Sequence, residues 1–152
     1  MQLPVFDYHP DPIGTGSVEP SDAECVCCSQ ARGYIYTGPV YAVDELDDQL
    51  CPWCIADGSA ADRFEAVFCD VDPPADIRDD IADVISERTP GFSGWQQERW
   101  LFHCGDGAAF LGVVGAKELE GDESALRSLR DELTGRSDAA IDHYLSALDQ
   151  CR

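Results

Sequence analysis

Two C-x-x-C pairs dominate the N-terminal half of this 152-residue sequence. Cys25 and Cys28 form the first pair, Cys51 and Cys54 form the second, and twenty-two residues separate the pairs. Four thiolates at this spacing can close a tetrahedral shell around Zn²⁺, an ion with no geometric preference of its own. Because a closed shell leaves no open position for a substrate or a water molecule, the pattern predicts one structural zinc ion.

The residues around the pairs predict the local fold of a zinc module over residues 25–68. Residues 33–36 and 40–43 are rich in β-branched and aromatic side chains and are separated by a Thr-Gly-Pro turn, so we expect a β-hairpin between the pairs. A helix is expected over 59–68. The order pair, hairpin, pair, helix is typical of a treble clef, with Cys54 near a helix start. A zinc ribbon, with the second pair on a turn between strands, is the alternative.

The remaining sequence completes one domain of the α+β class, since 152 residues suffice for one ordinary core. Residues 1–24 are rich in Pro, Asp, Gly and Ser and are expected to form an extended arm. Apolar residues at helical spacing predict an amphipathic helix over 77–85 and two more after residue 125. Residues 95–104 fit either a helix or a buried strand. We therefore expect a zinc-binding domain over 1–115 and a helical tail over 116–152 that packs on it.

Charge and the N-terminal sequence restrict the compartment and the partners. Ten basic residues stand against thirty acidic ones, a formal net charge of −20 that opposes binding to nucleic acid or anionic lipid. Residues 1–18 lack the basic and apolar regions of a secretory signal, and no apolar run has the length needed to cross a bilayer. We expect a cytoplasmic protein, in which eight cysteines indicate metal or redox chemistry rather than disulfides.

The same cysteines leave a redox alternative open. The segment from Cys51 to Cys54 resembles a dithiol motif, but such motifs lie at a strand-to-helix turn of a βαβ unit, which this sequence does not supply. Cys27 is expected to be a buried thiol, although it could replace either member of the first pair as a ligand. Cys69 and Cys151 are isolated in the sequence and are expected to pack in the core.

Several polar and aromatic residues outside the pairs are candidates for binding a ligand. The stretch 95–100 combines amide and aromatic side chains, which suit a binding groove, although tryptophans also anchor cores. Glu98, His103, Cys104 and Asp106 could form a second metal site or an acid/base group, but a histidine beside apolar residues is more often a core residue. The possible ligand-binding residues are His9, Asp11, Arg32, Tyr34, Tyr36, Trp95, Gln96, Glu98 and His103.

A series of longer motifs resembles the bacterial CbrC family. The motifs are LP at 3–4, YHPDP at 8–12, CVCC at 25–28, RGYIY at 32–36, GPVY at 38–41, LCPWCIADGSAA at 50–61, RTPG at 88–91 and WQQE at 95–98. The resemblance covers about residues 3–115 and implies that the cysteine pairs are the family's cysteine motif. Members of that family are largely uncharacterised and its name-giving member is associated with colicin tolerance, so the resemblance implies no defined reaction.

These observations favour a non-enzymatic, zinc-stabilised cytoplasmic protein that binds a protein or a small molecule. The predicted binding surface comprises the arm, the tyrosines at 34 and 36 and the 95–100 segment. The alternative is an enzyme, either a thiol oxidoreductase using Cys51 and Cys54 or a metal-assisted hydrolase around His103. The sequence contains no G-x-S-x-G, phosphate-binding glycine loop or H-E-x-x-H motif, so no common hydrolase or nucleotide-binding signature supports that alternative.

Overall fold

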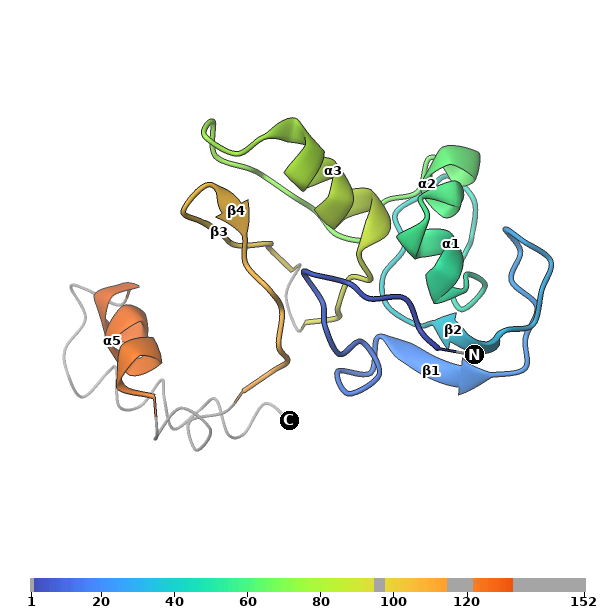
Figure 1. Cartoon of the computed structure of the whole chain (residues 1–152), viewed down its shortest axis with the longest axis horizontal. Coiled ribbons are helices and arrows are strands. Elements are labelled where there is room, and N and C mark those ends of the chain that lie inside the picture. The colour runs from blue at the N-terminus through green and yellow to red at the C-terminus, as the bar shows by residue number, and fades with distance from the viewer. Residues whose placement is uncertain (1, 95–97, 115–121, 133–152) are drawn as a thin grey trace. The chain divides into compact units, whose positions relative to one another are not determined.

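The computed structural model describes residues 2–94, 98–114 and 122–132 of the chain. The chain divides into two compact units, Met1–Leu111 and Gly112–Arg152. The first unit contains the strands β1 (Val18–Ser21), β2 (Gly33–Tyr36), β3 (Phe102–His103) and β4 (Asp106–Gly107), and the helices α1 (Pro52–Ala56), α2 (Ser59–Phe64) and α3 (Asp79–Arg88) (Figure 1). The second unit contains α5 (Glu123–Glu132). The prediction of the α+β class is confirmed.

The first sheet is an antiparallel pair of β1 and β2, with Val18 opposite Tyr36 and Ser21 opposite Gly33. The expected hairpin between 33–36 and 40–43 is therefore wrong in its pairing, because β2 pairs with a part of the arm. The burial of Val18 explains why β2 pairs with this segment, since the Val18 side chain is 1% exposed and packs in the core beside Tyr36. The last part of the predicted N-terminal arm therefore contains the strand β1. Residue 41, in the expected second strand, forms only an isolated bridge with Val67.

Two short helices follow the second cysteine pair. α1 begins at Pro52, a residue favoured at the first helical position because its missing N–H needs no partner there. Gly58 then adopts a left-handed conformation with φ of 82°, which separates α1 from α2. The predicted helix over 59–68 is confirmed as far as Phe64, where Glu65 ends it in a left-handed conformation. The sequence analysis did not predict α1.

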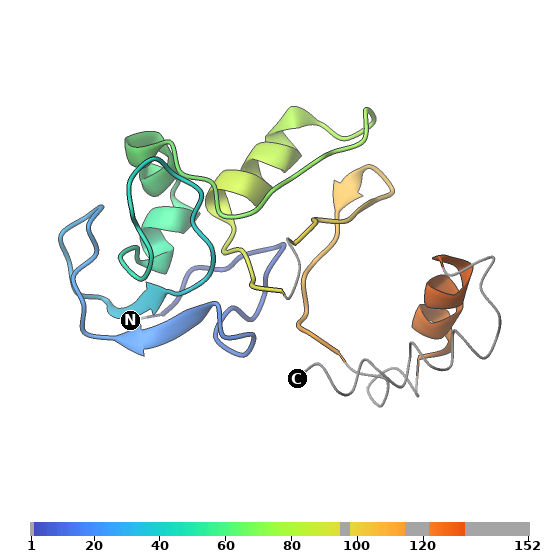
Figure 2. The same ribbon diagram turned by 180° about the vertical axis from the view of Figure 1, so that it is seen from behind.

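The amphipathic helix predicted between 77 and 85 is present as α3. Asp79 and Asp80 lie in its first turn and Arg88 in its last, the charge distribution that the helix dipole favours. Ile85 is fully buried, whereas Val84 is 39% exposed, so the apolar stripe is narrower than the sequence indicates. Both views of the ribbon show α1 beside α2 and β2, and the β3–β4 hairpin beside α3 (Figures 1 and 2).

Two hydrophobic clusters hold the first unit together. The larger cluster joins β1, β2 and α1 and includes three of the cysteines, Cys25, Cys51 and Cys54, among its buried residues. The smaller cluster contains Cys69 and Ile85, with aromatic side chains from residues 92–110 packed against it. Three of the four predicted ligands thus lie in the larger cluster. The cysteine group is therefore packed within the hydrophobic core of the first unit.

The sequence leaves residues 95–104 open between a helix and a strand, and the end of this stretch forms the strand β3. β3 and β4 form a two-residue hairpin through Cys104 and Gly105, whose φ values of 56° and 78° are those of the tight turns that link antiparallel strands. Trp95 and Gln96 lie outside the described residues. α5 confirms the first predicted helix of the tail; the second, around residues 141–148, lies outside the described residues, and packing of the tail on the domain stays a prediction.

None of the helices in the described part of the chain is long and apolar enough to cross a membrane.

Candidate metal centre

The four predicted cysteine ligands converge on one point. The sulfur atoms of Cys25, Cys28, Cys51 and Cys54 all lie within 4.8 Å of one another. The separations are 3.8 Å between Cys25 and Cys54, 3.9 Å between Cys28 and Cys51, and 3.6 Å between Cys51 and Cys54. A tetrahedral ion with Zn–S bonds of about 2.3 Å places its sulfur ligands about 3.8 Å apart, whereas a disulfide bond measures about 2.05 Å. The group therefore fits a tetrahedral metal ion.

A turn and a helix start position these sulfur atoms. The first pair lies on a tight turn in which Ser29 N–H donates to the carbonyl of Cys25 over 2.7 Å. Ser29 has a φ of 54°, so the chain reverses immediately after Cys28. Cys51 directly precedes α1, and Cys54 N–H donates to the Cys51 carbonyl over 3.1 Å. The second pair therefore spans the N-terminal end of α1, with Cys51 just before the helix and Cys54 in its first turn, and both sulfur atoms lie close to the first pair.

The electrostatics of the group favour a bound cation. The hydrogen bond from the Cys51 thiol lowers the pKa of Cys25 to about 4, with help from the backbone N–H groups of Cys28, Cys51 and Cys27 and against the effect of burial. The pKa of Cys51 is raised, because its thiol donates to Cys25, and burial raises the pKa of Cys54 to about 12. One thiolate thus keeps its neighbours protonated, and a divalent cation would displace those protons on binding.

The chemistry of the donor set restricts which ion fits. Four thiolates in a tetrahedral arrangement suit Zn²⁺ or iron, whereas Mg²⁺ and Ca²⁺ prefer oxygen ligands. All four positions of such an ion would be taken by sulfur, so the centre would supply structure and no Lewis-acid site. The cysteines at 25, 51 and 54 are at most 2% exposed, which limits access of solvent to the sulfur atoms.

Three more cysteines in the described residues lie outside this group. Counted with the four of the group, all seven described cysteines are free thiols. Cys27 is half-buried, and its sulfur lies 3.6 Å from the hydroxyl of Ser59, so the structure places it beside the ligands. Cys69 is buried and donates to the carbonyl of Ile85 over 2.9 Å, as expected of a packing thiol. Cys104 is exposed, with its sulfur 4.0 Å from Nε2 of His103. Cys151 lies outside the described residues.

The predicted second cluster around His103 is not assembled. Glu98 is buried and accepts a hydrogen bond from the hydroxyl of Tyr41 over 2.9 Å, whereas His103 is exposed on β3. Asp106 accepts a hydrogen bond from Tyr8 over 2.7 Å. Among the described residues, the structure brings together only the four cysteines in a group of three or more metal-binding side chains.

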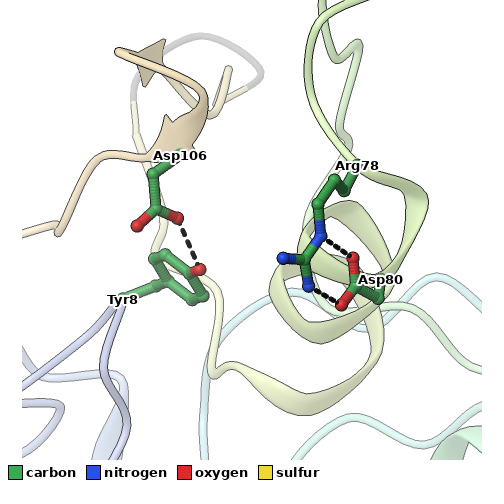
Figure 3. A network of polar contacts seen from close by, with 4 residues as sticks. All are labelled: Tyr8, Arg78, Asp80 and Asp106. Atoms are coloured by element: carbon green, nitrogen blue, oxygen red, sulfur yellow. Dashed lines mark hydrogen bonds and ion pairs between the residues drawn. The ribbon is translucent and has the colours of Figure 1, made fainter.

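A polar network that the sequence analysis missed joins the arm to the β3–β4 hairpin. The Tyr8 hydroxyl donates to Asp106, and Arg78 forms an ion pair with Asp80 on the neighbouring helix start (Figure 3). The hydrogen bond from Tyr8 lowers the pKa of Asp106, with smaller contributions from Gly107 N–H and Arg78. No local motif marks such a network, because its residues lie up to 98 positions apart in the sequence.

Besides Glu98, two of the possible ligand-binding residues are buried within the fold. The Nδ1 atom of His9 lies 2.7 Å from the Pro90 carbonyl and its Nε2 atom lies 2.6 Å from the Thr15 hydroxyl. Tyr36 is also fully buried; its hydroxyl donates to the Pro39 carbonyl over 2.7 Å and accepts from Gly91 N–H over 3.0 Å. A ligand at either residue would have to displace one of these internal contacts.

Three other candidates lie closer to the surface. The Asp11 side chain accepts a hydrogen bond from Gly14 N–H over 2.9 Å, which closes a turn of the arm. Tyr34 and Arg32 are half-buried, and the guanidinium of Arg32 lies over the ring of Trp53 at 5.6 Å from its centroid. Arg32 and Trp53 also line a surface depression beside α1. Their ligand-binding role stays a prediction.

Comparisons with known proteins identify the family. The model of an uncharacterised protein family, UPF0167, matches residues 3–151. A UPF0167 protein of Mycobacterium bovis is 52% identical over 154 aligned positions, which cover 99% of this chain and 82% of the relative. A UPF0167 protein of Pseudomonas aeruginosa is 53% identical over 120 positions, covering 77% of this chain and 67% of the relative. No solved structure matches the chain.

These matches overturn the resemblance to the CbrC family, because the family model and the relatives carry the name UPF0167. The match also extends through the tail, well beyond residue 115 where the resemblance ended. The chain belongs to the uncharacterised protein family UPF0167.

Proposed function

We propose that the chain is a zinc-stabilised binding protein, in which a single Zn²⁺ ion fixes the fold of residues 25–68 and a partner binds to the surface of that fold. The ligands are Cys25, Cys28, Cys51 and Cys54. The observation that carries the proposal is the convergence of their sulfur atoms within 4.8 Å at separations that suit Zn–S bonds. No reaction takes place at the metal, because sulfur fills all four positions.

The proposed ion has a structural role because of the segments that it would join. One pair lies on the turn after the arm, and the other lies on the first turn of α1, so the ion connects segments more than twenty residues apart. The unfolded chain offers no such preformed site, and the free energy of metal binding therefore stabilises the folded state. A knuckle-like first pair and a helical second pair support the treble-clef form over the zinc ribbon.

We also propose that the protein functions in a reducing compartment, as the predicted cytoplasmic location implies. All seven described cysteines are free, and oxidation of the ligand thiols would compete with metal binding. The partner is a protein or a small molecule, since a net charge of −20 opposes nucleic acid and anionic lipid surfaces.

The redox alternative has one observation in its favour. Cys51 and Cys54 lie 3.6 Å apart at the start of a helix, as in dithiol oxidoreductases. Their burial and their raised pKa values oppose it, because an attacking thiol must be exposed and readily ionised. Insulin-reduction activity that disappears in Cys51→Ser would support this alternative, and a second equivalent of zinc would support a hydrolase around His103.

The test compares Cys54→Ala with Cys27→Ala, a control at a thiol beside the group but outside it. Native mass spectrometry and thermal melting are measured on the protein purified without added metal. We expect one zinc ion in the wild type and in Cys27→Ala, and loss of both zinc and the cooperative melting transition in Cys54→Ala. Wild-type melting and zinc content in Cys54→Ala would contradict the proposal.

A further inference from the structure

A shallow depression of about 480 Å³ lies on the surface of the zinc module beside α1. Its walls are mainly apolar and come from Leu3, Pro4, Trp53 and Ala56. The arm therefore supplies one wall and α1 the other. Arg32 lies at the same depression and supplies its positive charge.

The guanidinium of Arg32 is held in place but keeps free donors. It lies over the Trp53 ring at 5.6 Å from the centroid, and its Nε donates to the amide oxygen of Gln30 over 3.0 Å. Within the described part of the chain no carboxylate forms an ion pair with Arg32, whereas Arg78 and Arg99 each pair with an aspartate. Its two terminal amino groups are therefore available, in the planar geometry that binds a carboxylate through two parallel hydrogen bonds.

Charge selects among the possible carboxylates. The chain carries a net charge of −20 and Asp57 also lines the depression, so a strongly acidic segment would be repelled. A single carboxylate on an otherwise neutral peptide avoids this repulsion. At the C-terminus of a peptide, the carboxylate and an apolar side chain belong to one residue, so the first can meet Arg32 while the second contacts Leu3 and Pro4.

We propose that this depression binds the C-terminal carboxylate of a partner protein whose last residue is apolar. The inference rests on the proposed function, because the metal would fix the positions of Arg32 and Trp53, the two residues that carry the proposed site. Trp53 lies between the ligands Cys51 and Cys54, and Arg32 follows the ligand Cys28 by four residues. Removal of the zinc ion should therefore abolish binding of the peptide as well as destabilise the fold.

The test uses twenty fluorescein-labelled pentapeptides, neutral before the last position and differing only there, each with a free C-terminal carboxylate or a C-terminal amide. Fluorescence anisotropy gives the dissociation constants for the full-length chain with bound zinc. We expect binding of the acids that end in apolar residues, and binding about 10- to 100-fold weaker for their amides, because the charge-assisted hydrogen bonds are lost.

Three variants link the result to Arg32. Arg32→Gln should weaken binding of the acids by the same factor and remove the difference between acid and amide. Arg32→Lys, which keeps the charge without the planar fork, should bind with intermediate affinity. Arg99→Gln removes the same charge from an exposed pair with Asp72 and should bind as the wild type.

Zinc content and melting are measured on the same samples, which separates the two proposals. If zinc is bound but no acid binds, or acids and amides bind equally, or Arg32→Gln binds as the wild type, this inference is wrong and the zinc proposal stands. If the wild type contains no zinc, the proposed function itself fails.

Discussion

The backbone N–H of Cys51 donates a hydrogen bond to the sulfur of Cys25 over 3.2 Å. This contact joins the two cysteine pairs directly, since one partner precedes α1 and the other lies on the turn after the arm. A backbone donor aimed at a ligand sulfur stabilises the thiolate and reduces the negative charge that four sulfur ligands would bring. The hydrogen bond thus orients the ligand and supports its ionised form in the same step.

Removal of the proposed zinc ion should destabilise the first unit. At neutral pH a zinc chelator should lower the free energy of unfolding by about 5 kcal/mol or more, because structural zinc contributes about 10–16 kcal/mol of binding free energy in small zinc domains. Urea unfolding followed by circular dichroism measures the change, and added Zn²⁺ should reverse it. Cys104→Ala, at an exposed thiol outside the group, should respond to the chelator as the wild type does. An unfolding curve that the chelator leaves unchanged would argue against a structural ion.

The thiols should differ in reactivity in the folded protein. Cys104 is exposed and should react first with iodoacetamide. Cys69 should remain unmodified, because it is 1% exposed and burial raises its pKa to about 12. Limited alkylation followed by peptide mass spectrometry gives the order. Modification of Cys69 as fast as that of Cys104 would contradict the described packing of the second core cluster.

The hydroxyl of Tyr36 should stabilise the fold. Tyr36→Phe leaves the Pro39 carbonyl and the Gly91 N–H without this partner inside the protein, which should cost about 1–3 kcal/mol of unfolding free energy. Tyr34→Phe is the matched control, because within the described residues the Tyr34 hydroxyl has no hydrogen-bond partner, and it should change stability by less than about 0.5 kcal/mol. If the two variants lower the free energy of unfolding equally, the hydrogen bonds of the Tyr36 hydroxyl make no net contribution to stability.

The stability of the protein should fall as the pH drops below about 6.5. Burial lowers the pKa of His9 below its ordinary value of 6.5, against smaller opposite effects of the Pro90 carbonyl and Asp11. The neutral His9 ring therefore makes its full contribution to the free energy of unfolding above the pKa that His9 has in the unfolded state. Below it the unfolded state takes up the proton first, and stability decreases, by at most about 1.4 kcal/mol per pH unit, until the lower folded pKa is reached.

Urea unfolding at pH 7.5 and 5.5 measures this dependence. His9→Gln should show a smaller loss of stability between the two values, whereas His103→Gln, at an exposed ring, should show the wild-type loss. Zinc content is followed in each sample, because protonation of the ligands affects all three proteins alike. The same loss in His9→Gln and in the wild type would contradict the assignment to His9.

The convergence of the four cysteines could be predicted from the sequence, because the spacing within each pair is local. Two C-x-x-C pairs restrict the geometry of their sulfur atoms wherever the pairs meet. The helix at 79–88 could also be predicted, since its apolar residues recur at helical intervals. Both features depend on residues that are near each other in the sequence.

Long-range pairings escaped the sequence analysis. Residues 18–21 contain Pro20, and the sequence predicts them only as part of an extended arm. They pair with β2 because Val18 is buried and β2 offers a partner strand. His9 is a possible ligand-binding residue in the sequence, and the sequence does not reveal that the fold buries it against Pro90, 81 residues away. Arg32 and Trp53 lie in separate sequence motifs, and only the fold places one over the other.

The most direct test of the account is the metal content of each chain, measured by native mass spectrometry of protein purified without added metal, with a thiol count on the same sample. The account predicts one zinc ion per chain and four thiols, at Cys25, Cys28, Cys51 and Cys54, that resist alkylation until a chelator is added. A chain without zinc, in which Cys51 and Cys54 form a reducible pair, would contradict it.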